Sequence, residues 1–196
     1  MGLTALEKLN LAERDRLRLG LAKEEANRLQ NLMQEILLYA KPQVLQFEEL
    51  DLNAFLEEML VSLQEMPEAS ERQIDLIRIQ PSVKIRADKD KLKQVLINLI
   101  RNACEAISAG ERVTCQITIA NKPSLVCLSV HNGGTPIPSD ILPKLTQPFC
   151  STKPEGTGLG LAIVRRIVEA HGGKLSIQSD ASSGTIVSFT IPVSEL

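Results

Sequence analysis

The strongest hydrophobic pattern in the chain lies between residues 88 and 110, where apolar positions follow a helical period and Asp88 is placed to cap the first turn. A second face of this predicted helix groups Asn98, Asn102 and Glu105 within about 60° of one another. Asparagine competes with the backbone for hydrogen bonds, so two asparagines one turn apart inside a helix indicate a functional requirement. The apolar face is expected to comprise Leu92, Leu96, Leu99, Ala103, Ala106 and Ile107.

A second helical pattern fills residues 11–40, with Asn10 as the expected N-cap and Pro42 as the stop. Its apolar positions alternate at spacings of three and four, as in a coiled coil. A helix of this length cannot bury such a seam alone, so we expect a homodimer through this helix; folding back onto the rest of the chain is the alternative. The seam consists of Leu19, Ala22, Ala26, Leu29, Met33, Ile36 and Ala40.

The remaining pattern predicts alternating helices and strands after a connector at residues 42–50. Helices are expected at residues 51–66, beginning at an Asp51 cap, and at residues 159–170. The expected strands cover residues 74–80, 83–86, 113–120, 125–131, 174–179 and 185–192.

Composition excludes several classes of function. Lysine and arginine number 22 against 24 acidic residues, and there is no Trp and only one Tyr, so a nucleic-acid surface is not expected. The four cysteines have no metal-type spacing and are expected to be reduced core thiols of a cytoplasmic protein. No apolar run is long enough to span a bilayer, and the N-terminus lacks a signal-peptide pattern; any membrane contact is expected only through regions upstream of this chain.

Residues 132–158 form a long loop, rich in proline and glycine, inside an otherwise compact pattern. Loops of this length are usually lids or disordered segments. The loop begins with Asn132-Gly133-Gly134, and the sequence Gly156-Thr157-Gly158-Leu159-Gly160 at its other end runs directly into a helix. Glycines at a helix start let backbone N–H groups approach a phosphate.

The order of these parts resembles the nucleotide-binding boxes of the sensor histidine kinases. The parts are Asn98 and Asn102 on one helix, Asn132-Gly133-Gly134 after a strand, Pro148-Phe149 in the loop, Gly156 to Gly160 before a helix, and Gly184-Thr185 in a hairpin. The resemblance covers about residues 45–193. It implies an α+β fold, a two-layer sandwich of the Bergerat type in which a mixed sheet packs on three helices, preceded by the long N-terminal helix. Gyrase B, the MutL repair proteins and the heat-shock chaperones that bind ATP share this fold.

The resemblance also implies roles for particular residues. Asn102 becomes a ligand of Mg²⁺, Asn98 helps to order the phosphates of ATP, and Lys153 meets the terminal phosphate. Asn132, Gly134, Ile137 and Thr185 border the adenine. The phosphates are cradled by Gly156, Thr157, Gly158, Leu159, Gly160 and Leu161.

Three side chains keep alternative interpretations. Arg101 either reaches the phosphates or faces water, and Lys153 is otherwise a solvated loop charge. Glu105 is a candidate general base for ATP hydrolysis, because Asn98 occupies the position where the ATP-hydrolysing relatives carry glutamate, and an amide cannot act as a base. Cys150 in the loop is expected to be a buried, inert thiol.

The chain departs from the family pattern at two points. Asn132 stands where most members have aspartate, which accepts a hydrogen bond from the adenine amino group. A hydrogen bond to a neutral acceptor contributes roughly 0.5–1.5 kcal/mol, whereas one to a charged acceptor contributes roughly 1.5–3 kcal/mol. We therefore expect about tenfold weaker nucleotide binding, with an unchanged preference for adenine. The second departure is that neither His131 nor His171 has the sequence context of the phosphoacceptor histidine, so this chain alone is not expected to autophosphorylate.

The sequence therefore predicts two domains. Residues 1–42 are expected to be part of a dimerisation and phosphotransfer hairpin that lacks its acceptor helix, and residues 43–196 an ATP-binding catalytic domain. The predicted function is transfer of the γ-phosphoryl group of Mg-ATP to a histidine outside this chain, for signalling to a response regulator. The alternatives are a nucleotide-binding regulatory module of the same fold and an ATPase.

Overall fold

A computed structural model describes residues 12–41, 44–120, 124–151, 153 and 156–193 of the chain. It divides into two compact units, Met1–Lys41 and Pro42–Leu196. Among the described residues, no helix is both long and apolar enough to cross a membrane.

The first unit contains one long helix, α2 (Glu13–Ala40). Its N-cap is Ala12, which makes no side-chain hydrogen bond, and the expected cap Asn10 lies outside the described residues. No residue of α2 is buried. The larger apolar side chains of the helix, between 55% and 67% exposed, include Leu17, Leu21, Leu29, Met33 and Leu37.

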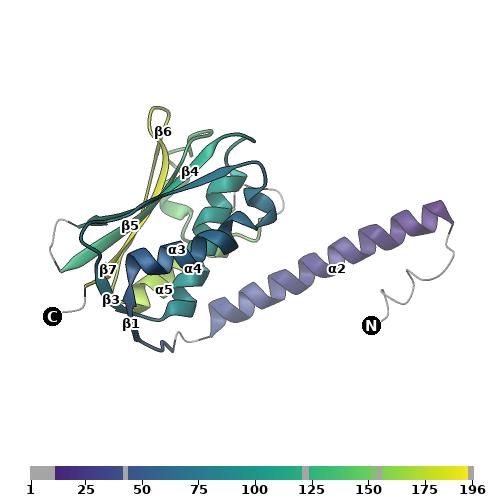
Figure 1. The fold of residues 1–196 in the computed structure, drawn as a ribbon. Helices are drawn as coiled ribbons and strands as arrows, with labels where there is room; N and C mark the ends of the chain where they lie inside the picture. The colour runs from purple at the N-terminus through teal and green to yellow at the C-terminus, as the bar shows by residue number, and fades with distance from the viewer. Residues whose placement is uncertain (1–11, 42–43, 121–123, 152, 154–155, 194–196) are drawn as a thin grey trace. The chain divides into compact units, whose positions relative to one another are not determined.

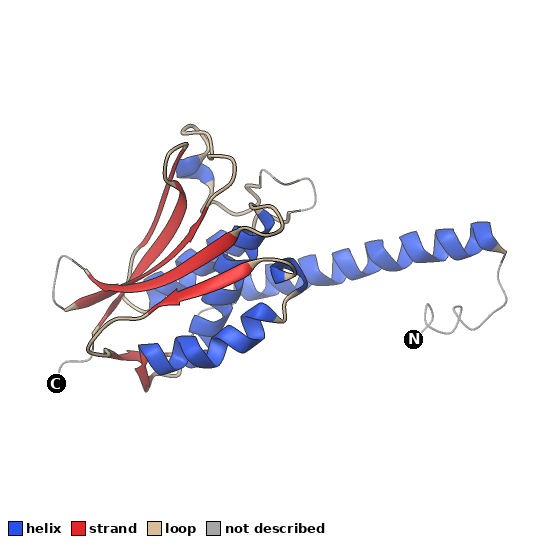
Figure 2. Ribbon diagram, turned by 45° about the horizontal axis from the view of Figure 1, so that its top comes forward, coloured by secondary structure: helices blue, strands red, loops and turns tan. Residues whose placement is uncertain are grey.

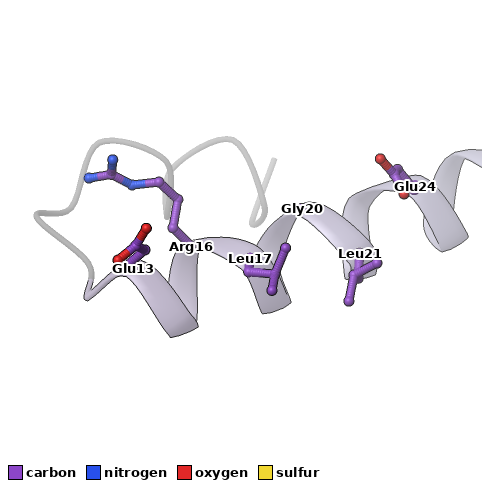
Figure 3. Close-up of a pocket in the computed structure, with 6 residues that line it drawn as sticks. All are labelled: Glu13, Arg16, Leu17, Gly20, Leu21 and Glu24. Atoms are coloured by element: carbon purple, nitrogen blue, oxygen red, sulfur yellow. The ribbon is translucent and has the colours of Figure 1, made fainter.

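A hollow of about 340 Å³ runs along the first half of α2. Figure 3 shows the turns of α2 that carry its described lining residues. None of the residues predicted for the nucleotide site is among them, so this hollow is not that site. The lining residues are Glu13, Arg16, Leu17, Gly20, Leu21 and Glu24.

The second unit is built on a five-stranded mixed sheet in the order β2-β4-β5-β7-β6, of which only the β2–β4 pair is parallel. A smaller antiparallel pair, β1–β3, joins it through a bridge between Ile85 and Val193. The strands are β1 (Glu48–Asp51), β2 (Gln73–Ile77), β3 (Lys84–Ala87), β4 (Arg112–Ile119), β5 (Leu125–Asn132), β6 (Leu175–Asp180) and β7 (Gly184–Pro192).

Three helices cover one face of this sheet (Figures 1 and 2): α3 (Leu52–Gln64), α4 (Lys89–Glu105) and α5 (Gly160–Ala170). Two short 3₁₀ turns, η1 (Pro67–Ala69) and η2 (Leu142–Lys144), complete the unit. Alternate residues of the central strands point into the core, as in the aligned pair Leu128 and Phe189. The predicted α+β sandwich with a mixed sheet on three helices is confirmed.

Two strand predictions differ from the structure. The predicted connector contains β1, a four-residue strand with one buried side chain, Leu50, which is too short to show a period. The strand predicted at residues 74–80 ends at Ile77 because the chain then leaves the sheet. Beyond Ile77, the backbone of Ile79 bonds to the side chain of Asn53 in α3 and, among the described residues, not to a neighbouring strand. The Asn53 side chain accepts from the Ile79 N–H at 3.3 Å and donates to the Ile79 carbonyl at 2.8 Å.

Helix α4 buries more of its surface than its predicted apolar face. Val95, Ile100 and Cys104 are buried together with the predicted residues, because α4 packs on both the sheet and its neighbouring helices. Ala106 is exposed, contrary to prediction, since the helix ends at Glu105.

Asp88 joins the start of α4 to two other segments. Its carboxylate accepts the backbone N–H of Lys91 at 3.0 Å, as a helix cap, and that of Gln46 at 2.9 Å. Its own N–H donates to Nε2 of His171 at 3.0 Å, and Nδ1 of His171 donates to the Ile167 carbonyl at 2.8 Å. His171 is therefore a buried neutral imidazole that ties the end of α5 to the start of α4, rather than a cation at a helix end.

The loop between β5 and α5 is anchored at its end by Gly158. This residue has φ +69°, and a Cβ there would lie 2.6 Å from the Phe149 carbonyl carbon and from the Cys150 nitrogen. The backbones of the two loop segments are thus in direct contact, which only glycine permits.

All four cysteines are free, as predicted. Cys104 and Cys115 are buried, and burial raises the pKa of Cys115 to about 12, so its thiol is protonated at neutral pH. Cys127 and Cys150 are only half-buried, so the expectation of four core thiols is wrong for these two.

The Asp88 cap gives a pH-dependent prediction. Burial opposes ionisation of Asp88, but the backbone donors Gln46 and Lys91 outweigh it and hold the pKa below its ordinary value of 3.8. The stabilisation is therefore complete above pH 3.8 and is lost as the pH falls through the folded-state pKa. Asp88→Ala should lower the free energy of unfolding by about 1–2 kcal/mol at pH 7 in urea titrations, and this difference should shrink at pH 3. Asp140→Asn, on an exposed loop side chain, is the matched control, and a difference that does not change with pH would contradict the assignment.

The glycines allow backbone conformation to be separated from steric contact. Gly158→Ala should lower the free energy of unfolding by about 2–4 kcal/mol, because it combines a positive φ with a backbone clash. Gly110 has φ +82° but open space around the position of a Cβ. Gly110→Ala should therefore lower the free energy of unfolding by only about 1 kcal/mol. Gly133→Ala, which has neither feature, should be neutral in the same urea titrations. Equal effects at Gly158 and Gly110 would show that the loop contact is not formed.

Candidate nucleotide-binding site

The polar side of α4 is not a uniformly open face. Asn98 is only 7% exposed. Its Nδ2 donates to the Gln94 carbonyl at 3.1 Å, and its Oδ1 accepts from Nη2 of Arg101 at 2.8 Å. The expectation that Asn98 displays its amide on an open face is therefore wrong, and Arg101 holds Asn98 instead of extending into water.

Asn102, one turn further along α4, is in a different environment. Its side chain is half-buried, and no hydrogen bond to it is found among the described residues. Glu105 follows one turn later at the end of the helix. The carboxamide of Asn102 is thus available to a ligand, whereas that of Asn98 is occupied.

The start of α5 lies beside Asn98. A Cβ built at Gly160 would be 3.1 Å from Oδ1 of Asn98, so the glycine is needed for this close approach. The N-cap of α5 is Leu159, a fully buried aliphatic residue that makes no side-chain capping bond. The N-cap side chain therefore provides no acceptor for the first-turn N–H groups of α5, whose positive partial charge points toward the glycine-rich turn.

The long loop reaches the same region through Lys153. Nζ of Lys153 forms an ion pair with Oε2 of Glu105, and the two side chains are 40% and 33% exposed. The Lys153 backbone is held by Ser151, whose Oγ accepts the Lys153 N–H at 3.0 Å and donates to its carbonyl at 3.1 Å. The Gly156 N–H also donates to that carbonyl, at 3.2 Å. An ammonium group from the loop is thereby fixed at the end of α4.

A second group of predicted residues forms around the end of β5. Asn132 is 4% exposed, and its Nδ2 donates to the Gly133 carbonyl at 2.6 Å. This bond leaves Oδ1 as the outward acceptor, and no donor in the described part of the chain reaches it. Thr185, 7% exposed, is aligned with Asn132 across the β5–β7 pair.

Ser179 connects two of the predicted adenine-site residues. Its Oγ accepts the backbone N–H of Ile137 at 2.9 Å and lies 2.8 Å from Oγ1 of Thr185. Sequence reasoning missed Ser179, because a lone serine in a predicted strand carries no motif. Its place opposite Thr185 in the β6–β7 pair follows only from the hairpin register.

Gly134 links this second group to α4. It has φ +87°, and a Cβ there would lie 2.2 Å from the Ala106 carbonyl oxygen at the end of the helix. Two sets of predicted residues therefore contact α4: Gly160 and Lys153 at Asn98 and Glu105, and Gly134 at Ala106. Ile137 and Thr185 are joined through Ser179, and Thr185 is aligned with Asn132.

Neither histidine is placed as a phosphoacceptor. His131 is exposed at the end of β5 and donates from Nε2 to the Ser183 carbonyl at 2.6 Å. His171 is 5% exposed and uses both ring nitrogens in the hydrogen bonds described above.

The donor set suits a magnesium–phosphate complex better than a protein-only metal site. Within the described residues, no group of three or more His, Cys, Asp or Glu side chains is placed to hold an ion. A single neutral carboxamide, Asn102, fits Mg²⁺ only if phosphate oxygens and water supply the other ligands. The positive helix start and the Lys153 ammonium provide the charge that such phosphates require.

The chain resembles bacterial sensor kinases in sequence. It is 35% identical over 170 residues to sensor histidine kinase ZraS of Escherichia coli K12, covering 87% of this chain and 36% of ZraS. It is 36% identical over 170 residues to sporulation kinase C of Bacillus subtilis 168, covering 86% of this chain and 39% of that kinase. The chain thus spans little more than a third of the length of these curated relatives.

Solved structures of histidine kinases share the fold. Full-length ShkA in complex with AMPPNP matches 97% of this chain and 41% of its own, with a TM-score of 0.81 and 27% identity. The catalytic domain of histidine kinase ThkA matches 76% of this chain and 96% of its own, with a TM-score of 0.65 and 36% identity. ThkA in complex with the response regulator protein TrrA matches 98% of this chain and 55% of its own, with a TM-score of 0.74 and 33% identity.

The family model described as histidine kinase-, DNA gyrase B-, and HSP90-like ATPase matches residues 87–195, more than half of the chain, and includes α4, the long loop and the start of α5. The chain is a member of this ATPase family, and its relatives are sensor histidine kinases.

Proposed function

We propose that residues 43–196 form the ATP-binding catalytic domain of a sensor histidine kinase, which transfers the γ-phosphoryl group of Mg-ATP to a histidine other than His131 and His171. The observation that supports this proposal is that three separate segments contact the second half of α4. Gly160 lies against Asn98, Lys153 pairs with Glu105, and Gly134 packs on Ala106. Asn102, whose side chain has no hydrogen bond among the described residues, lies between the first two of these contacts along the helix.

In this proposal the chain itself supplies positioning and charge. The N–H groups at the start of α5 bind the phosphates, and Lys153 neutralises the terminal phosphate. Asn102 would hold Mg²⁺, which would offset the negative charge of the phosphates. Asn98 and Arg101 act indirectly: the hydrogen bond between them fixes the Asn98 side chain, against which Gly160 packs.

Adenine binding is assigned to the group around Asn132. Among the described residues no donor reaches Oδ1 of the buried Asn132, so the exocyclic amino group of adenine would supply one. The bond from Nδ2 to the Gly133 carbonyl fixes the orientation of the amide, with Oδ1 as its acceptor. Ser179 keeps Ile137 and Thr185 together at the edge of this site.

Hydrolysis by this chain is disfavoured at the position where the ATP-hydrolysing relatives carry glutamate. Asn98 stands there; it is an amide and is already hydrogen-bonded, so it cannot activate water. This favours use of ATP as a phosphoryl donor over its hydrolysis.

The remaining parts of the proposal concern partners. The exposed apolar side chains of α2 support a role for residues 1–42 in dimerisation with a second copy. The ThkA complex with TrrA supports a response regulator as the downstream partner. Free cysteines support a reducing, cytoplasmic location.

Asn102→Ala tests the magnesium assignment. Calorimetric titration with a non-hydrolysable ATP analogue should show about tenfold weaker binding or more in Mg²⁺, with little change in EDTA, because only the metal-dependent contact is removed. Asn27→Ala, on an exposed position of α2, is the control and should match the wild type. Equal weakening with and without Mg²⁺ would contradict a metal-binding role.

Asn132→Asp tests the adenine assignment through two measurements of opposite sign. A charged acceptor should tighten ATP binding by up to about tenfold. The same substitution removes the hydrogen bond to the Gly133 carbonyl, so the free energy of unfolding without nucleotide should fall by about 1 kcal/mol. Unchanged ATP affinity in a folded Asn132→Asp protein would remove this residue from the site.

A further inference from the structure

The ion pair between Lys153 and Glu105 connects the long loop to α4 at the predicted phosphate site. Glu105 lies three residues after Asn102, which on a helix is a rise of about 4.5 Å along the same side. Lys153 therefore sits close to the position where a terminal phosphate would be held. In the structure, its ammonium group is paired with the carboxylate of Glu105.

The loop backbone prepares this contact. Ser151 and Gly156 both hydrogen-bond to the backbone of Lys153, and a Cβ at Gly156 would lie 2.3 Å from Oγ of Ser151. The backbone of Lys153 is thus held by contacts that do not involve its ammonium group, so the side chain can change partner while these contacts remain.

The two anionic partners of Lys153 exclude each other. A triphosphate near Asn102 would repel the carboxylate of Glu105, which is only a third exposed and so is incompletely screened by water. Lys153 cannot bind both groups in full, and the terminal phosphate carries more negative charge than the carboxylate. Arrival of ATP must therefore transfer the ammonium from Glu105 to the phosphate.

We propose that Glu105 is a positioning residue that acts as a latch: it holds Lys153 in the nucleotide-free protein, releases it to the γ-phosphate of ATP, and takes it back when the product is ADP. This rests on the proposed function above. The latch lowers the affinity for ATP, because the ion pair must be broken, but leaves the affinity for ADP nearly unchanged, because the pair can persist. Glu105 thereby lowers the preference of the site for ATP over ADP.

The test compares ATP-analogue and ADP affinities by calorimetry in Mg²⁺ for the wild type, Glu105→Gln, Lys153→Met and the double variant. Glu105→Gln should bind the ATP analogue about three- to tenfold more tightly, with ADP affinity within about twofold of wild type. The gain should be much smaller in the Lys153→Met background, because the latch needs both side chains. Glu49→Gln is the matched control, since it removes the same charge from a surface ion pair with Lys84 outside the site, and it should change neither affinity.

Each other outcome has a defined meaning. Weaker ATP-analogue binding by Glu105→Gln would make Glu105 a metal-site residue and overturn the latch. If Glu105→Gln bound both nucleotides more tightly to the same extent, or bound the ATP analogue more tightly by the same factor with and without Lys153, Glu105 would act only by repelling the phosphates. Either result would also overturn the latch. If the wild type binds the ATP analogue but Glu105→Gln is indistinguishable from it, the latch fails and the proposed function stands. Absence of binding by the folded wild type would overturn the proposed function itself.

Discussion

The antiparallel packing of α4 and α5 is the constraint on which the site depends. Toward one end of the pair, a Cβ at Gly160 would lie 3.1 Å from Oδ1 of Asn98, so a larger residue would push the Asn98 side chain aside. At the other end, His171 accepts the Asp88 N–H and joins the end of α5 to the start of α4. These two contacts fix the direction and register of α5. Its positive end therefore lies beside the turn of α4 that carries Asn98.

At each end of the long loop, a glycine allows the backbone to come into close contact with another backbone segment. Gly134 packs on the last turn of α4, and Gly158 packs on the backbone at Phe149 and Cys150. Between these two contacts, the ion pair of Lys153 with Glu105 gives the loop a further contact with the end of α4. The proposed latch needs only this contact to be exchangeable, because the contacts of Gly134 and Gly158 do not involve Lys153.

Much of the fold could be predicted from the sequence because local signals agreed with tertiary packing. The caps Asp51 and Asp88 and the helical period located α3 and α4, and alternation located most strands. What failed depended on contacts between distant segments. Burial of Asn98 is caused by the start of α5, which a helical projection of α4 cannot show. Likewise, Ser179 contacts Thr185 across 6 residues, and Lys153 pairs with Glu105 across 48 residues. No local sequence pattern predicts either contact.

The central claim is that nucleotide binds between the start of α5 and the end of α4. Amide hydrogen exchange with and without an ATP analogue and Mg²⁺ tests it most directly, because it reports location and does not depend on any substitution. The account predicts slower exchange at the first-turn amides of α5, at the turn of residues 156–160 and at the end of α4, with no change along α2. Protection confined to α2, or saturating nucleotide that leaves the start of α5 unprotected, would contradict it.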